Sequence, residues 1–168
     1  MAALLNLFFE VCLLRKGPQD VPASQTLLRL SLLAYGMAGI TFTLVEGEVQ
    51  AALLRTLLDI GLLVGLTWGL LEVTGRRARF EQTLTTLAGT GALLALVALP
   101  VALWWQREMA SGAPSGLPSL LYLGLLGWSI AVMAHILRHA LSTSLAIGVL
   151  YTLGYLLAFI LLDRLLTG

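Results

Sequence analysis

The sequence predicts an all-α polytopic membrane protein: a bundle of five transmembrane helices, preceded by an N-terminal amphipathic helix that lies in the membrane interface. Of the 168 residues, 58% are hydrophobic and only 11% are charged, and the mean hydropathy is +0.92. A soluble domain carries about 25% charged residues, and a chain this apolar cannot cover its own surface with polar groups. Lipid is therefore the expected solvent for most of the chain, which excludes soluble enzymes.

Charge and cysteine content exclude further classes of protein. The net charge is +1, from 10 basic and 9 acidic residues, so no basic patch is large enough to hold a nucleic-acid backbone. The single cysteine, Cys12, cannot form an internal disulfide, and no cysteine and histidine residues stand at metal-ligand spacing. We therefore expect no metal, no cofactor and no nucleic-acid partner.

Residues 1–25 form a first unit, in which a helix is expected over Met1 to Leu14. Two basic residues follow this apolar stretch and none precedes it, so it lacks the pattern of a signal peptide. A helix of this length rises only about 21 Å, too short for a hydrocarbon core of about 30 Å. Asn6 and Glu10 share one face, which predicts a helix in the interface. A helix packed on the bundle is the alternative.

Residues 26–168 form the transmembrane domain, with five apolar stretches of the roughly 20 residues that a spanning helix needs. Short breaks rich in glycine, proline or charge divide them. The predicted spans are Thr26–Leu44, Val49–Val73, Phe80–Trp105, Leu117–Leu137 and Ser142–Leu162. Ser24 is expected to cap the first of them, because a serine hydroxyl can accept a hydrogen bond from a free amide of the first turn.

Basic residues are unevenly distributed between the ends of these spans. With a cytoplasmic N-terminus, the outer side receives only Arg107 and Arg164. The inner side receives Arg15, Lys16, Arg29, Arg76, Arg77, Arg79 and Arg138. Because cytoplasmic loops carry the excess of lysine and arginine, the N-terminus is predicted inside and the C-terminus outside. A leucine- and alanine-rich composition with a single lysine indicates a GC-rich bacterial genome. The expected location is therefore a bacterial inner (cytoplasmic) membrane.

Small residues form a stripe along the second span. Gly61, Gly65 and Gly69 repeat at the GxxxG spacing, which lets another helix backbone approach closely. We expect this stripe to pack against another helix of the same chain, with a homodimer contact as the alternative.

Two charges lie inside the second span, one helical turn apart. Arg55 and Asp59 stand at the spacing at which opposite charges pair on a helix. Ionisable groups within a span are costly and are candidates for function. One interpretation is structural, with Arg55 reaching the outer interface and Asp59 held by Arg55 and a hydroxyl. The other is a role in a polar cavity or partner site.

A second polar group is expected at the inner ends of the second and fourth spans. Glu72 lies at the same depth as His135 and Arg138, which predicts an ion pair between the two helices. His135 and His139 stand four residues apart, but no motif places a third ligand beside them, so a metal is not predicted.

The arrangement of the loops resembles that of a known family. A basic loop leads into Arg79-Phe80-x-Gln82 at the third span, and Gly127-Trp128 leads to Leu137-Arg138 in the fourth. With five closely spaced helices and a cytoplasmic N-terminal segment, these features resemble bacterial members of the Ypt-interacting protein (Yip) family over about residues 26–165. The resemblance implies membrane organisation or partner recruitment, without a defined catalytic site.

The sequence as a whole favours a non-enzymatic inner-membrane protein. No H-E-x-x-H, G-x-S-x-G or P-loop motif is present. The expected partners are membrane lipids and another membrane protein, or the chain itself as a homo-oligomer. The alternative function is a small-solute or ion transporter or channel subunit with Arg55 and Asp59 in its path. A permeation path needs polar residues at several depths in the membrane. Between Asp59 and Glu72, the second span has few polar residues apart from Thr67.

Overall fold

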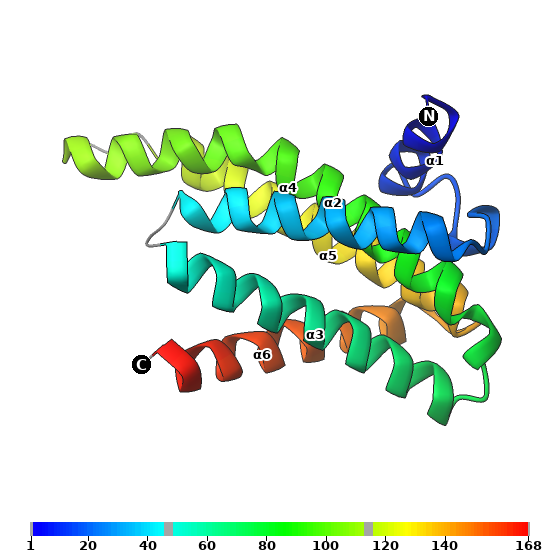
Figure 1. The fold of residues 1–168 in the computed structure, drawn as a ribbon. Helices are drawn as coiled ribbons and strands as arrows, with labels where there is room; N and C mark the ends of the chain where they lie inside the picture. Colours follow the sequence, from blue (N-terminus) through cyan, green and yellow to red (C-terminus); the bar gives the residue numbers. More distant parts are fainter. Residues whose placement is uncertain (1, 46–48, 113–115, 168) are drawn as a thin grey trace.

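The computed structural model describes residues 2–45, 49–112 and 116–167, and the regular structure within these ranges is entirely helical. Five of the helices described are long and apolar enough to span a bilayer (Figure 1). They are α2 (Gln25–Leu44), α3 (Val49–Val73), α4 (Phe80–Ser111), α5 (Leu117–Ala140) and α6 (Leu145–Thr167). The shorter elements are α1 (Ala2–Cys12) and the 3-10 turns η1 (Pro18–Asp20) and η2 (Arg77–Arg79). The predicted all-α bundle is confirmed.

Two helix boundaries differ from the prediction by several residues. The helix α4 continues past its predicted end at Trp105, because the next residue to leave helical geometry is Gly112, with φ of 73°. The helix α6 begins at Leu145 and not at Ser142, because Ser142 takes φ of 48° in the left-handed region and therefore lies in the turn. The hydroxyl of Ser144, the residue before α6, accepts a hydrogen bond from the backbone amide of Ile147 in the first turn of the helix.

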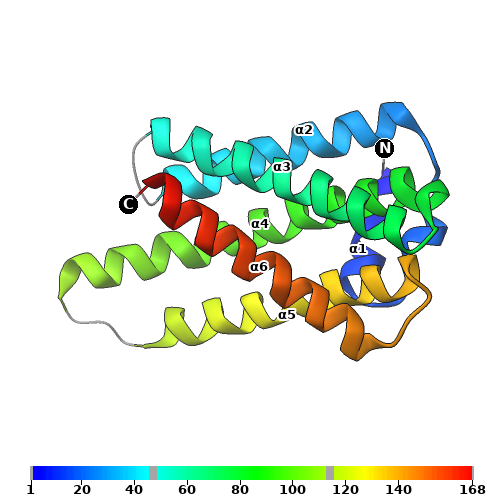
Figure 2. The ribbon, with the colours of Figure 1, turned by 90° about the horizontal axis from the view of Figure 1, so that it is seen from below.

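The two ends of the bundle differ in their packing. The proximal end, as we call it, holds α1, η2 and the turn between α5 and α6, and the distal end holds the end of α2 and the C-terminus (Figure 1). From their common turn, α5 and α6 diverge toward the distal end (Figure 2). The main hydrophobic core consists of Val11, Leu63, Leu84, Leu87, Val132, Ile136, Leu137 and Tyr155. Most of these residues belong to the proximal half of their helices, so the distal half is packed less tightly.

An arginine ties two turns of the proximal end together. The guanidinium of Arg79, which precedes α4, donates hydrogen bonds to the carbonyl oxygens of His139 and Ala140 and to the hydroxyl of Ser142, at 3.1, 2.9 and 2.8 Å. The carbonyls at the end of a helix have no partner in the helix and carry partial negative charge. Arg79 therefore fixes the start of α4 to the end of α5.

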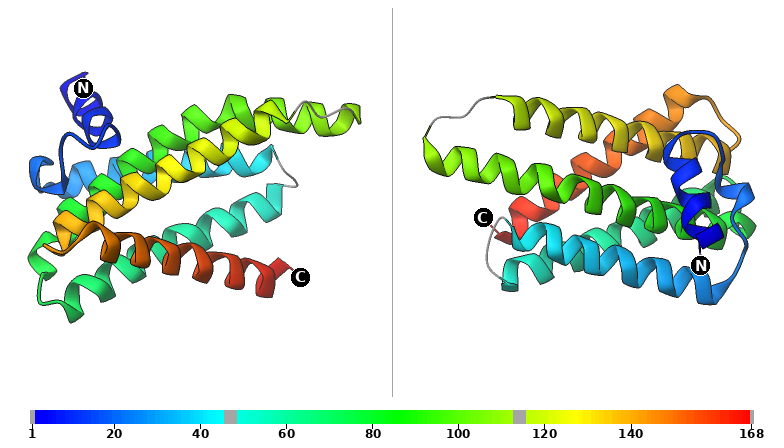
Figure 3. Two further views of the ribbon diagram at one scale, coloured as in Figure 1. Left: turned by 180° about the vertical axis from the view of Figure 1, so that it is seen from behind. Right: turned by 90° about the horizontal axis from the view of Figure 1, so that it is seen from above.

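The N-terminal helix α1 lies across the bundle and not along it (Figure 3). Phe8, Val11 and Cys12 are buried, and the indole of Trp128 in α5 donates a hydrogen bond of 2.8 Å to the carbonyl of Cys12. The alternative left open by the sequence, a helix packed on the bundle, is therefore what the structure shows. Phe9 on the opposite face is 56% exposed, and the interfacial position of this face stays a prediction.

Candidate functional site

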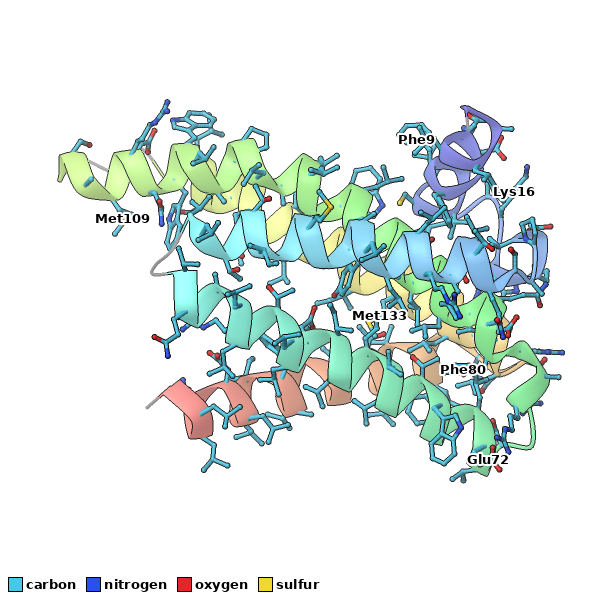
Figure 4. The ribbon with its side chains drawn as sticks, viewed as in Figure 1. Phe9, Lys16, Glu72, Phe80, Met109 and Met133 are labelled. Carbon is cyan, nitrogen blue, oxygen red and sulfur yellow. The ribbon has the colours of Figure 1, made fainter. Side chains whose placement is uncertain are left out.

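A cavity of about 540 Å³ lies among all five long helices. Its walls come mainly from the second half of α2, the first half of α3, the middle of α4 and α5, and the second half of α6. Leu63, Leu87 and Val132 belong both to this lining and to the hydrophobic core, so the core closes the proximal end of the cavity. Met133 of α5, which also lines it, points into the space between the helices (Figure 4).

A carboxylate with two phenol partners forms the main polar feature of the cavity. Both oxygens of Asp59 in α3 accept hydrogen bonds, from the hydroxyl of Tyr35 in α2 and from that of Tyr155 in α6. The ring of Tyr35 lies against Gly91 of α4, where a Cβ atom would stand only 2.6 Å from Tyr35 Cε2. A glycine at this position thus lets Tyr35 reach Asp59. We call Tyr35, Asp59 and Tyr155 the carboxylate cluster.

The predicted pair between Arg55 and Asp59 is wrong. Arg55 Nε donates instead to Asp163 Oδ1 of α6 at 3.0 Å, and both side chains are only partly exposed. The two acceptor oxygens of Asp59 are directed toward the tyrosines of neighbouring helices, so the contact along the helix is not made. Sequence reasoning missed Asp163, although it lies at the distal end of α6 and Arg55 near the distal end of α3. A comparison of the depths at which charged residues lie in or next to the predicted spans would have paired Arg55 with Asp163.

The hydroxyl groups of the lining differ in their hydrogen bonding. Thr43, Thr90, Ser129 and Thr152 each donate to a carbonyl oxygen of their own helix, at 2.7 to 2.9 Å in the shortest bond of each. Thr56 is 5% exposed, and its Oγ1 atom has no hydrogen-bond partner among the described residues. This oxygen is closed to solvent and lies beside Gly39 of α2, so it is part of the contact between α2 and α3 and is not open to a molecule in the cavity.

The glycine stripe does not pack as predicted. A Cβ atom built on Gly61, Gly65 or Gly69 meets no atom of the described chain within 4 Å, so the expected contact within one chain is wrong. The buried side of α3 consists of Ala52, Thr56, Leu63, Thr67 and Leu71. Its polar residues mark the inward face, since polar groups in a span turn toward the bundle interior. The homodimer alternative for the stripe stays a prediction.

The predicted ion pair at the proximal end is also wrong. Glu72 lies 3.5 Å from Arg77, at the exposed end of its own helix, and not beside Arg138. Arg138 Nε is buried without a hydrogen-bond partner in the part of the chain that the structure describes. His135 Nε2 lies 3.0 Å from the carbonyl oxygen of Lys16, in the segment that follows α1. Glu72, Arg138 and His135 all lie at the proximal end, as predicted. Glu72 is exposed there, however, and contacts Arg77, which is close to it in the sequence.

Two histidines contact each other at the proximal end. The rings of His135 and His139 meet edge to face, with centroids 4.6 Å apart. Within residues 2–45, 49–112 and 116–167, no third histidine, cysteine or carboxylate completes a metal site with them.

The cavity therefore combines a mainly apolar wall with a carboxylate that retains acceptor capacity. A small molecule with an apolar body and a polar group that donates hydrogen bonds fits this chemistry. Comparison of the chain with protein-family models, with curated proteins and with solved structures gives no match.

Proposed function

We propose that this chain is a non-enzymatic integral membrane protein that binds a small lipophilic molecule or a lipid in the cavity. The observation that carries the proposal is the carboxylate of Asp59, which stands in the wall of an otherwise mainly apolar cavity. The volume of about 540 Å³ supports it, because pockets for small molecules measure roughly 300–1,000 Å³ and are mostly apolar with a few placed polar groups.

The location of the protein is part of the proposal. We place it in a bacterial inner membrane, with the proximal end at the cytoplasm, because the seven basic residues of the predicted inner side flank that end. The distal half, with the cavity, then faces the outer leaflet. Membership of the Yip family stays a proposal that rests on loop spacing, and membrane lipids or a second membrane protein are the proposed partners of the exposed apolar surface.

Transport is the second candidate function. It is favoured by one observation, which is that Arg55 and Asp59 both line the cavity. Leu63, Leu87 and Val132 close the proximal end, so passage requires these side chains to separate. Binding without passage needs no such movement, and for this reason binding is the first proposal.

Extraction of bound molecules tests the proposed function. The protein is purified from its native membrane in mild detergent, and small molecules released by organic solvent are identified by mass spectrometry. Ala98, which lines the cavity, is replaced by phenylalanine to fill it, and the adjacent Val97, 54% exposed on the outer face of α4, is replaced in the same way as the matched control.

The two variants give opposite expectations. We expect a lipophilic compound to be retained by the wild type and by Val97→Phe, and to be lost from Ala98→Phe. Equal retention by both variants, or no compound above the detergent blank, would overturn the proposal.

A further inference from the structure

We infer that the molecule bound in the cavity is a lipophilic cation, namely an amphiphile whose ammonium group donates hydrogen bonds to Asp59. This inference rests on the proposed function and names the class of ligand. It follows from the charge of the lining, from the direction of its hydrogen bonds and from its aromatic side chains.

The formal charge of the lining is negative. It contains one guanidinium, Arg55, and two carboxylates, Asp59 and Asp163. Arg55 pairs with Asp163, whereas Asp59 pairs with no cation of the described residues and is held by two neutral phenols. A carboxylate in a low-dielectric interior attracts a positive charge far more strongly than it does in water. A cation is therefore favoured over an anion at Asp59.

The hydrogen bonds of the lining leave mainly acceptors for a ligand. Asp59 accepts one bond at each oxygen, and an ionised carboxylate has about four acceptor positions, so about two stay available. Thr90 and Thr152 donate their hydroxyl hydrogens to carbonyl oxygens of their own helices, so neither offers a donor to a ligand. An ammonium group carries only donors, which matches this set.

Aromatic rings lie in the distal part of the cavity. Phe42 of α2 and Tyr122 of α5 line it and stack with their centroids 6.5 Å apart, and Trp105 stacks on Tyr122 at 6.2 Å. The faces of aromatic rings attract cations, and their apolar surface suits the body of an amphiphile. A cation that enters from the distal end thus meets favourable groups before it reaches Asp59.

Three probes of one shape test the inference. Naphthylmethylamine is a cation at neutral pH, naphthylmethanol is neutral and naphthoate is an anion. Their affinities are measured by equilibrium dialysis against the whole protein in lipid nanodiscs, with empty nanodiscs as the blank. Both the amine and the alcohol can donate a hydrogen bond to Asp59, but only the ammonium group adds the attraction between opposite charges. We therefore expect the amine to bind about tenfold or more tightly than the alcohol, and the naphthoate to bind most weakly.

Two variants locate the effect. Asp59→Asn removes the charge, so the preference for the amine over the alcohol should disappear while the affinity for the alcohol stays within about twofold. Thr56→Val removes an unpartnered hydroxyl that is closed to the cavity, without changing the shape of the side chain, so it is the matched control and should fold normally and change the affinity for the amine by no more than about twofold. The comparison among the three probes on the wild type does not depend on either variant.

The outcomes separate the two proposals. If the alcohol or naphthoate binds as tightly as the amine, or if the amine preference survives in Asp59→Asn, the cation inference is overturned and the binding function stands. If no probe binds above the blank, or if Ala98→Phe binds all three as well as the wild type does, the proposed function fails and the inference fails with it.

Discussion

At the residue scale, the site depends on tyrosines that connect three helices through one carboxylate. Tyr155 is 8% exposed and donates to Asp59, so it contributes both to the core and to the cavity. Hydrogen bonds to a charged group are worth about 1.5–3 kcal/mol, more than those between neutral groups. The carboxylate cluster is therefore expected to hold α2, α3 and α6 together as well as to shape the site.

Replacement of Tyr155 by phenylalanine tests this role. We expect Tyr155→Phe to lower the free energy of unfolding in detergent by about 1–3 kcal/mol, because Asp59 loses a donor. Tyr151 lies one turn earlier on α6 and is 38% exposed, so Tyr151→Phe is the matched control and should change little. Equal effects of the two changes would contradict a structural role of the cluster.

Sequence reasoning found some of these residues and missed others. Arg55 and Asp59 were visible because charged residues are rare within spans, but the choice of partner depends on how helices distant in the sequence are placed. Asp163 lay just beyond the predicted end of the last span, and Tyr35 reaches Asp59 only because Gly91 leaves room for its ring. Neither contact follows from spacing along one helix.

At the element scale, glycine spacing alone did not identify the packed face of a helix. The residues of α3 that turn inward are those that carry polar groups, whereas Gly61 to Gly69 lie on the open side. On α6 the situation is reversed, because Gly148 meets the backbone of α5 and a Cβ atom there would collide with the carbonyl oxygen of Ala134. Helix limits were more predictable, and Ser24 caps α2 as expected.

Two glycine substitutions distinguish these faces. Gly148→Ala should destabilise the protein by about 1–3 kcal/mol, because the added methyl group pushes α6 away from α5. Gly65→Ala should leave the thermal stability of the monomer unchanged, since nothing lies within 4 Å of the new atom. Thermal unfolding with detection of oligomeric state measures both, and a large loss of stability for Gly65→Ala would show that its face is occupied.

The packing of α1 on the bundle protects its cysteine. Cys12 is 5% exposed, and burial raises the pKa of its thiol from 9.0 to about 11, because the thiolate is poorly solvated there. The thiolate is the reactive form, so the rate of alkylation by iodoacetamide in the folded protein should still increase between pH 9 and about pH 11.

The matched control places the thiol on the exposed side of the same segment. Arg15→Cys in a Cys12→Ser background puts it at an exposed position. This thiol should react rapidly, and its rate should level off near pH 9, the usual thiol value. Rapid alkylation of native Cys12 at neutral pH would show that α1 is detached from α4 and α5.

At the scale of the whole molecule, composition and hydropathy sufficed to predict the fold class and the five long helices. They did not predict the divergence of α5 and α6, because this depends on where the tight contacts lie. Gly148 and the anchor at Arg79 bring helices together at the proximal end, and the distal half is left with a cavity. The position of the site thus follows from uneven packing along the bundle.

The orientation of the bundle in the membrane is a prediction at this scale. In a Cys12→Ser background, a membrane-impermeant maleimide applied from outside should label a cysteine at Ser111 and spare one at Arg77. Ser111 is the last residue of α4, and Arg77 lies in the turn η2 that precedes α4, so the two positions mark opposite ends of this span. The reverse pattern would place the N-terminus outside and turn the cavity toward the cytoplasm.

The most direct test of the central claim is to locate a bound molecule in the protein. A lipophilic phenyl-diazirine probe is photolysed with the protein in nanodiscs, and the labelled residues are mapped by mass spectrometry. We predict saturable labelling at Ala95, Met133 and other residues that line the cavity, and loss of this labelling in Ala98→Phe. Labelling restricted to exposed positions such as Leu96 and Val97, without saturation, would contradict the account, because the probe would then have reported only the surrounding lipid.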